Sequence, residues 1–483
     1  MAVRARLSAP RQVREDWHFH SVKSASLPSS MIFGGDRRME AENFLASGFA
    51  TRQAILSKSK GWSPLAEVAT TWQPSRLKGI QVSPDFGTPF LAATQVFDLR
   101  PVPRKWLSLD RTDDHAQRFV PERTIVMTCS GSVGRATLAD SSISGMLISH
   151  DLLRIDAKHE SDWGWIYAYL RSPTVRAMMT SAQYGHMIKH LEVSHLNVLP
   201  ILRVDPSHAR SFNDMAEAVV QKRNASVEAT HAAEKLFAAA AGGVIPLDDG
   251  SLGFSVSAAQ AFGSDRRRFE AYHHNPNILG LNRHLSKNAK GWQSIAELGF
   301  DAWLPTRFKR IPAEDGVPFV DSADIFEVNP DITKRIADRD FGDQFSGRVK
   351  AGWIMLARSG QIYGLNGSAL IAGHAHEGKV ISDHVIRVAP NEARCKVGYL
   401  LTAITHPELG RPRIKSLAYG SSIPEIEVED LKSFSIPRFS PKVETEIADQ
   451  AELAATLRDE ADIIEIDLAD RAEQVVSYFI SHR

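Results

Sequence analysis

The sequence predicts an α+β protein in which two homologous domains are separated and joined by two long helices that form an antiparallel coiled coil. Three observations support this expectation: an internal repeat in fixed order, short β patterns beside one helical stretch in each copy, and a long uninterrupted helical stretch after each copy. The expected boundaries are 1–206 for the first domain, 207–242 for the first long helix, 243–440 for the second domain and 441–483 for the second long helix.

The repeat is visible as short blocks that recur in the same order. FGGDRRMEA at 33–41 returns as FGSDRRRFEA at 262–271, and KGW at 60–62 returns at 290–292. GTPF at 87–90 and SG at 130–131 then return as GVPF at 316–319 and SG at 359–360, both at an offset of 229 residues. The order of these blocks indicates a duplicated domain, and we expect the first block to maintain the fold despite its charges.

Later blocks continue the repeat at slightly larger offsets. IS and RI at 148–149 and 154–155 pair with IS and RV at 381–382 and 387–388, an offset of 233 residues. YG and LEV at 184–185 and 191–193 pair with YG and IEV at 419–420 and 426–428, an offset of 235. Small insertions between fixed blocks are what loop changes in two copies of one domain would give.

Each copy combines short strands with one helical stretch. Apolar β patterns cover 123–128 in the first copy and 352–357 in the second. Helical spacing covers 163–179 and 396–405. This mixture of elements predicts the α+β class for each copy.

A long helix is expected after each copy. Residues 207–241 contain neither Pro nor Gly, and a single helix of that length would extend about 50 Å. In the second helix, apolar residues recur every three or four positions, as in a coiled-coil seam: Ile447, Ala451, Ala454, Leu457, Ala461, Ile464, Leu468, Ala472, Val475 and Phe479. The helices could pair antiparallel and hold the copies apart, or each could simply cover its own domain.

Charge and cysteine content narrow the class of protein. The 483 residues carry no net charge, but 441–483 contain eleven acidic and four basic residues, which leaves +7 on 1–440. The two cysteines, Cys129 and Cys395, fit neither a disulfide framework nor a zinc motif. We therefore expect a cytoplasmic protein, without a secretory signal or a membrane span.

The repeated motifs resemble those of the type I restriction-modification DNA specificity subunits. In the first copy they are GW at 61–62 with LAEV at 65–68, GTPFL at 87–91 and SGSVGR at 130–135. In the second they are GW at 291–292 with IAEL at 295–298, GVPFV at 316–320 and RSGQIYG at 358–364. The segment before each tryptophan is longer here than in compact members of that family, which leaves open the system to which the chain belongs.

The resemblance implies a non-catalytic subunit that binds double-stranded DNA. The two copies would be target-recognition domains that read the two halves of a bipartite, asymmetric target. The partners that the family implies are two DNA methyltransferase subunits and an additional restriction or translocase subunit. The implied role is phage defence, and the family provides no cofactor or metal.

Candidate DNA contacts are polar residues on glycine-containing turns and in the cluster after each helical stretch. Lys and Arg suit phosphates, while Arg, Gln, Asn and Ser suit base edges. The first copy offers Ser130, Ser132, Arg135, Gln183, Tyr184, His186 and Lys189. The second offers Arg358, Gln361, Tyr363, Arg411, Arg413, Lys415, Tyr419, Ser421 and Ser422. Because the turn residues differ between the copies, we expect each copy to read a different half-site.

Two other functions stay open at this stage. The first is a self-contained DNA-modifying enzyme, for which the sequence offers little support. GSVG at 131–134 lacks the flanking residues of a nucleophile elbow or a phosphate-binding loop. NPN at 275–277 resembles only the start of a methyltransferase motif. The histidine pairs at 18/20, 273/274 and 374/376 have no neighbouring ligands in sequence. A duplicated adaptor that binds only protein is the other alternative, and a steep salt dependence of DNA binding would argue against it.

Overall fold

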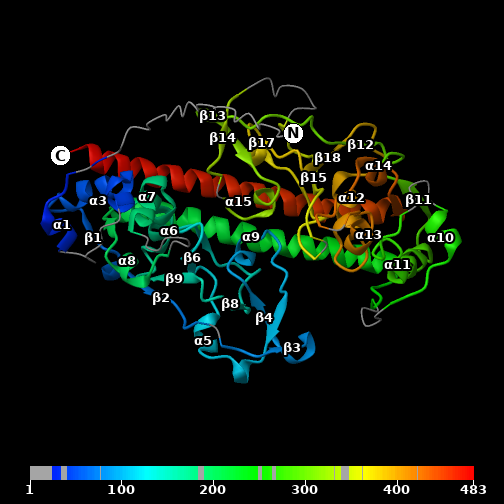
Figure 1. Ribbon diagram of the computed structural model, residues 1–483, viewed down its shortest axis with the longest axis horizontal. Helices are drawn as coiled ribbons and strands as arrows, with labels where there is room; N and C mark the ends of the chain where they lie inside the picture. The colour runs from blue at the N-terminus through cyan, green and yellow to red at the C-terminus, as the bar shows by residue number, and fades with distance from the viewer. Residues whose placement is uncertain are drawn as a thin grey trace, which may run out of the picture.

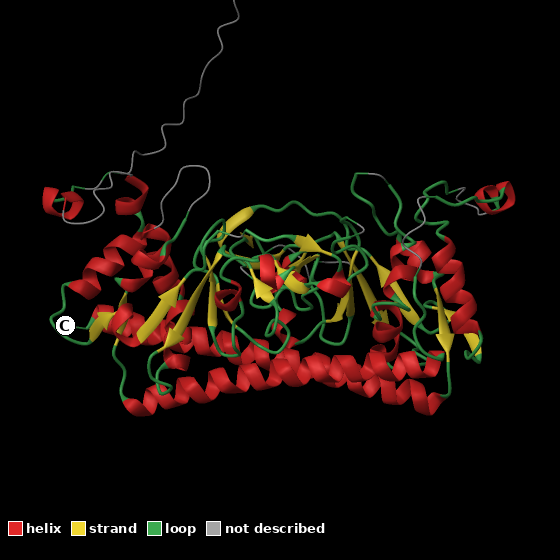
Figure 2. Ribbon diagram, turned by 90° about the horizontal axis from the view of Figure 1, so that it is seen from below, coloured by secondary structure: helices red, strands yellow, loops and turns green. Residues whose placement is uncertain are grey.

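The two long helices lie side by side along the length of the molecule (Figure 1). Seen from below, they lie along one side of the molecule, and the sheets lie on the other side (Figure 2). This computed structural model describes residues 24, 26–33, 41–76, 78–182, 190–247, 253–263, 268–330, 332–338, 347–361, 363–420 and 422–482. We call the part before the first long helix the first half and the part between the two long helices the second half. Among the described residues, no helix has both the length and the apolar character needed to cross a bilayer.

The long helices are α9, Pro206–Ala241, and α15, Pro441–Ser481. α9 begins where the Asp205 side chain accepts hydrogen bonds from two backbone N–H groups, and it ends at Gly242, whose φ of 86° suits glycine. The helices run antiparallel, because Lys222 pairs with Glu460 while Ser226, farther along α9, donates to the Ala454 carbonyl, nearer the start of α15.

The first half contains eight short helices and ten strands in its described residues. The helices are α1 Ser29–Phe33, α2 Ala41–Leu45, α3 Ser47–Leu56, α4 Leu65–Val68, α5 His115–Arg118, α6 Trp163–Arg171, α7 Pro173–Ala182 and α8 Val193–Asn197. The strands are β1 Trp62–Pro64, β2 Ala69–Trp72, β3 Gln81–Val82, β4 Thr88–Leu91, β5 Lys105–Leu107, β6 Ile125–Thr128, β7 Ala136–Leu138, β8 Leu147–Ile148, β9 Leu152–Ala157 and β10 Pro200–Leu202.

The described residues of the second half form five helices and nine strands. The helices are α10 Ala258–Phe262, α11 Pro276–Ser286, α12 Val397–Thr405, α13 Arg411–Lys415 and α14 Val428–Lys432. The strands are β11 Gly291–Ser294, β12 Phe300–Trp303, β13 Pro312–Val320, β14 Arg335–Ile336, β15 Ile354–Ala357, β16 Ala369–Ile371, β17 Val380–Ile381, β18 Val385–Pro390 and β19 Ser435–Arg438.

The two halves share one sheet topology. The order β2-β9-β6-β7 in the first half corresponds to β12-β18-β15-β16 in the second, and the pair β1-β10 corresponds to β11-β19. The second sheet also corresponds: β4 pairs with β8 in parallel, as β13 pairs with β17. The mixed α+β class is confirmed, and equivalent backbones account for the repeated sequence blocks that the structure describes. Most of the first block, 34–40 and 264–267, lies outside the described residues.

A buried arginine explains one of those repeated blocks. Arg154 and Arg387 are both 0% exposed. Arg154 donates to the carbonyls of Ile148 and Ser149 at 2.9 and 3.0 Å, and Arg387 donates to those of Ile381 and Ser382 at 2.7 and 2.9 Å. Each guanidinium satisfies carbonyl groups where one sheet turns into the next, so both copies keep it.

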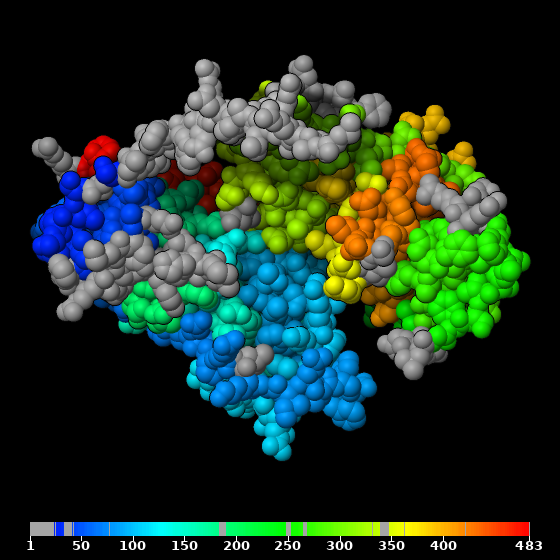
Figure 3. Space-filling view, in the orientation of Figure 1, coloured from blue at the N-terminus to red at the C-terminus, as the bar shows by residue number. Residues whose placement is uncertain are grey.

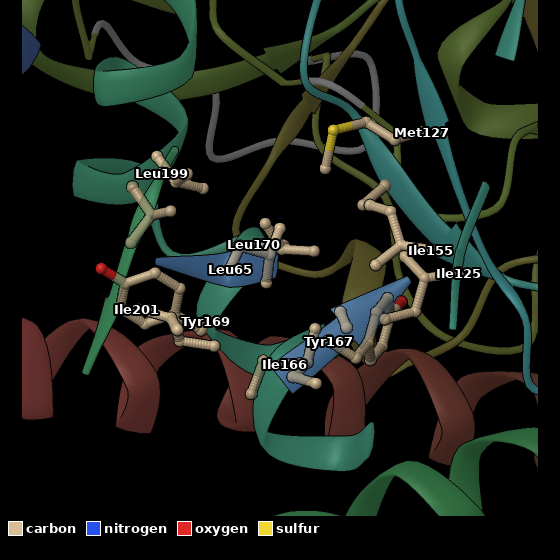
Figure 4. Close-up of a cluster of buried hydrophobic side chains, with 14 of the residues drawn as sticks. Leu65, Ile125, Met127, Ile155, Ile166, Tyr167, Tyr169, Leu170, Leu199 and Ile201 are labelled. Atoms are coloured by element: carbon tan, nitrogen blue, oxygen red, sulfur yellow. The ribbon is translucent and has the colours of Figure 1, made fainter. Parts of the chain in front are cut away.

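Both cores extend onto the long helices. In the first half, side chains from β6, β9 and α6 converge next to a long helix (Figure 4), and the same cluster includes Leu468, Ala472 and Val476 of α15. The second core includes Phe237 of α9 and Ile447 of α15. α15 therefore packs on both halves, so it does more than cover its own domain.

The expectation of one helix over 163–179 is wrong. The chain forms two helices, α6 and α7, which are separated at Ser172. Pro173 starts α7 and disfavours the helical conformation of the residue before it, so Ser172 adopts φ −56° and ψ 131°. The helix expected at 396–405 is present as α12.

The two halves also touch each other directly. Asp98 and Glu327 form an antiparallel bridge, in which the Leu99 N–H donates to Phe326 at 2.9 Å and the Val328 N–H donates to Phe97 at 2.6 Å. These partners are equivalent positions of the repeat, at the offset of 229, so the contact is pseudo-twofold. The distance between the halves is therefore fixed by this direct contact as well as by the long helices.

Candidate nucleic-acid interface

The candidate turn of the first half follows β6. Gly131 has a φ of 69°, which L residues with side chains rarely adopt, and this lets the chain reverse direction between β6 and β7. Ser132 is exposed, and Ser130 forms a bridge with His190. The second cluster of this half, Gln183, Tyr184, His186 and Lys189, lies outside the described residues.

Arg135, at the end of that turn, is bound to the second half. Its Nη1 donates to Glu327 Oε2 at 2.7 Å, its Nη2 to the Val328 carbonyl at 2.7 Å and its Nε to the Asn329 carbonyl at 3.0 Å. Its side chain is only 11% exposed and covers the Phe97 ring. The guanidinium expected to read DNA thus joins the two halves in this structure.

The equivalent turn of the second half presents larger side chains. Tyr363 is 74% exposed, and Gln361 is exposed while its Nε2 donates to the Ser422 carbonyl at 2.8 Å. Arg358 is less accessible, because its Nη2 lies 2.8 Å from Glu425 and 3.5 Å from Glu427. Tyr363 and Gln361 are therefore the candidates in this turn that can reach a ligand directly.

The second candidate cluster comes together with that turn. Ser359 and Tyr419 both bridge to Glu425, and the Tyr419 hydroxyl donates to Glu427. Ser422 is exposed, whereas Ser421 lies outside the described residues. The structure thus brings together two polar segments of the second copy that are about 50 residues apart and that the sequence analysis treats as separate clusters.

Arg411, Arg413 and Lys415 project from α13 with different environments. Arg413 is 3% exposed, donates to Asn282 Oδ1 and the Ser435 carbonyl, and lies over the Trp292 and Phe434 rings. Arg411 is partly buried and donates to the Gly364 carbonyl. Arg413 thus holds the second half together, which leaves Lys415 and part of Arg411 for a ligand.

A cavity of about 590 Å³ opens between the halves beside the first turn. Ser130, Ser132 and Arg135 line it from the first half, and Asp321, Asp324, Glu327 and Lys334 line it from the second. Burial raises the pKa of Asp324. We call this site the acidic cavity. Its carboxyl groups outnumber its cations, so it would repel a phosphate group.

Catalytic chemistry finds little support in the described residues. No group of three or more His, Cys, Asp or Glu residues there could hold a metal ion. Burial raises the pKa of both cysteine thiols to about 11, so neither is a thiolate nucleophile at neutral pH.

Sequence reasoning missed two arginines, Arg100 and Arg104, in the loop after Asp98. Arg100 pairs with Glu234 of α9 at 2.5 Å, and Arg104 is exposed. The pKa of Arg411 is lowered by burial and then by the positive charge of Arg100, so this loop lies near α13 of the other half. The repeat itself held a signal, because the equivalent positions in the second copy are Asn329 and Thr333, which are uncharged.

Comparison with known proteins gives matches among solved structures only. No protein-family model and no curated protein sequence matches the chain. The S subunit of a type I restriction-modification system from M. genitalium is similar over 88% of this chain and 97% of its own, at 14% identity and a TM-score of 0.32. The HsdS subunit from Thermoanaerobacter tengcongensis is similar over 87% and 96%, at 13% identity and a TM-score of 0.26.

Proposed function

We propose that the chain is a sequence-specific DNA-binding subunit that directs methyltransferase and restriction subunits to a bipartite, asymmetric DNA target. The observation that carries the proposal is the duplicated half: two copies share strand order and buried arginines but differ in the turn residues they expose. The two copies share one scaffold but expose different turn residues, as expected for two domains that recognise different DNA sequences. The motif resemblance to type I specificity subunits points to the same role.

In this proposal, the first half and the second half are the two target-recognition domains, 1–206 and 243–440. The accessible contacts are Ser130 and Ser132 in the first half and Gln361, Tyr363, Lys415 and Ser422 in the second. Gln183, Tyr184, His186, Lys189 and Ser421 remain candidates from the sequence. The chain has no catalytic role of its own, and two methyltransferase subunits complete the enzyme.

Methylation-sensitive sequencing of the host genome tests this function. We expect one split motif, with two different half-sites and a fixed spacer, to lose methylation when the gene for this chain is deleted. Re-expression of the chain should restore the same motif. If no motif depends on the chain, the DNA-reading function is wrong and the adaptor alternative gains support.

The spacing between half-sites gives a separate test. We infer that α9 and α15 act as a coiled-coil spacer, together with the direct contact between Asp98 and Glu327. Inserting one helical turn, about 5.4 Å, at matched positions in both helices should lengthen the spacer by one to two base pairs, at about 3.4 Å each, without altering either half-site. An unchanged spacer would show that the direct contact between the halves sets the distance.

A further inference from the structure

Four cationic side chains from both halves meet beside the contact between the halves. Arg100 and Arg104 come from the first half, and Arg411 and Lys415 come from α13 of the second; we call them the cross-half basic cluster. Burial, Arg100 and Arg104 all lower the pKa of Arg411. Burial, Arg411 and Arg104 lower the pKa of Lys415 to about 8. The geometry agrees. Arg100 pairs with Glu234 of α9, and Phe237 of the same helix packs against His406 with ring centroids 5.6 Å apart. The Arg411 N–H donates to the His406 carbonyl at 2.9 Å, so Arg100 lies beside the start of α13.

The cluster has fewer acidic partners than cations. Arg100 pairs with Glu234, and Asp98 is the other nearby acid, but burial raises the pKa of Asp98 to about 7. Among the residues that the structure describes, the side chains of Arg104 and Lys415 form no hydrogen bond or ion pair. Positive charge therefore remains uncompensated at neutral pH.

Arg411 keeps donors that the protein does not use. Its Nη2 donates to the Gly364 carbonyl at 3.0 Å and to Ser368 Oγ at 2.9 Å. Its Nε is buried and has no hydrogen-bond partner among the described residues. A buried guanidinium nitrogen without an acceptor costs free energy. An anion bound at the cluster would offset this cost through its charge, because the buried Nε itself is not accessible to a ligand.

Three of these four cations are not shared by the two copies. The equivalents of Arg100 and Arg104 are Asn329 and Thr333, at the offset of 229, and the equivalents of Arg411 and Lys415 are Arg176 and Thr180, at the offset of 235. The pseudo-equivalent region between the halves is the acidic cavity. Because three of the four cations have uncharged equivalents on the same backbone, the shared fold does not require them.

The position of the cluster indicates what it binds. It adjoins the turn that exposes Tyr363, since Arg411 donates to Gly364, and both halves contribute to it at their boundary. Figure 3 shows that the surface is hollowed between the blue segment of the first half, near residue 100, and the green segment of the second half that follows α9. Because both halves contribute to the cluster, a duplex bound by both halves can contact it with the segment between its half-sites.

We propose that the cross-half basic cluster binds backbone phosphate of the DNA spacer, between the two half-sites, and thereby clamps both halves on one duplex. This inference rests on the proposed function and adds a site to which both halves contribute. Guanidinium and ammonium groups bind phosphate by charge-assisted hydrogen bonds. Such contacts position a duplex without reading its sequence.

The test uses the full chain, assembled with its methyltransferase subunits, and measures Kd for target DNA from 50 to 200 mM salt. Arg104→Ala and Lys415→Ala should each weaken binding about fivefold to tenfold at 0.1 M salt and reduce the salt slope by about 0.9. Both half-sites of the methylated motif should stay unchanged. Lys415→Arg should keep the wild-type slope, and Arg210→Ala, which removes an exposed cation from α9, is the matched control.

Neutralised DNA locates the contact. Methylphosphonate linkages placed through the spacer should weaken binding by the wild-type complex at one or two positions, and Lys415→Ala should no longer respond there. Wild-type salt slopes in both variants would overturn the proposal, as would a loss of methyltransferase assembly with unaltered DNA affinity, which would make the cluster a protein-docking site. If the wild-type complex itself shows no sequence-specific DNA binding, the proposed function has failed instead.

Discussion

The two sides of the contact between the halves have the same backbone but differently charged side chains. On one side, Arg135 and Asn329 reach into the neighbouring half, and Asp321, Asp324 and Glu327 line a cavity. On the other side, Arg100 and Arg104 face Arg411 and Lys415. Duplication preserved the backbone pairing of Asp98 with Glu327 but left the surrounding side chains free to diverge. An asymmetric protein can thus arise from a symmetric fold.

The acids that anchor the two sides to the long helices differ most in burial. Glu465 of α15 is fully buried and accepts hydrogen bonds from Arg171 and Asn329, both at 2.6 Å, and from Arg223. Glu234 of α9 is 13% exposed and pairs with Arg100, which is 38% exposed. The first acid joins elements of both halves to both long helices, whereas the second forms one ion pair near solvent.

The largest effect is therefore expected at Glu465. Glu465→Ala should lower the free energy of unfolding by about 3–5 kcal/mol, because it leaves Arg171 and Arg223 buried without their carboxylate. Glu234→Ala should cost about 1 kcal/mol or less, as for a partly exposed pair. Urea denaturation of the full chain measures both. Equal losses would show that the two sides are anchored alike, and Glu465→Gln separates the charge from the hydrogen bonds.

The exposed turns should separate the halves functionally. Tyr363→Ala and Gln361→Ala should each relax one position of one half-site, at about 1–3 kcal/mol per lost base contact, and leave the other half-site intact. Ser132→Ala is the corresponding change in the first half. Methylome sequencing of complemented strains identifies the altered position. A change in both half-sites from one turn would mean that the halves do not read separate segments.

Substitutions of Arg358 can distinguish between two roles for this side chain, a base contact and the positioning of the turn. The sequence favours a base contact, whereas the structure pairs Arg358 with Glu425 and Glu427. If it reads DNA, Arg358→Ala and Arg358→Lys should both relax a base position. If it only positions the turn, the lysine variant should keep the motif, because a cation near the two carboxylates remains.

The sequence predicted the parts of the fold that depend on local pattern and repetition. The long helix expected at 207–241 appears as Pro206–Ala241, because apolar spacing, an N-terminal cap and a C-terminal glycine act within neighbouring residues. The break before Pro173 was missed, although a proline within a helical pattern was its signal.

Contacts across large sequence separations could not be predicted in this way. Arg135 looks like an ordinary exposed turn residue, but its acceptors lie 192–194 residues away, and Arg413 binds Asn282, which lies 131 residues before it. The cross-half basic cluster is likewise a product of the tertiary fold. A sequence can identify such residues as polar, while only the packing shows whether a guanidinium group faces solvent or another half of the chain.

The smallest expected effect concerns the two carboxyl groups at the centre of the contact. Burial and the charge of Glu327 raise the pKa of Asp98 to about 7, although Arg104, Arg135 and Arg411 act in the opposite direction. Glu327 instead has Arg135 as a direct partner at 2.7 Å. The equivalent positions should therefore respond with opposite signs when their charges are removed.

Asp98 should make the free energy of unfolding fall as pH rises. Below pH about 4, the Asp98 carboxyl is protonated in both the folded and the unfolded chain. Between pH about 4 and 7, only the folded chain keeps the proton, so the free energy of unfolding falls as the pH rises. Above pH about 7, the carboxyl is ionised in both states and the decline ends. Asp98→Asn should then match the wild type at pH 4 and exceed it by about 1 kcal/mol at pH 8, a modest gain because Asp98 keeps some solvent contact. Glu327→Gln should instead destabilise the chain at pH 8, since Arg135 loses its carboxylate. Denaturation curves at both pH values test the pair, and stabilisation by both substitutions would show that the Arg135 ion pair does not set the two sides apart.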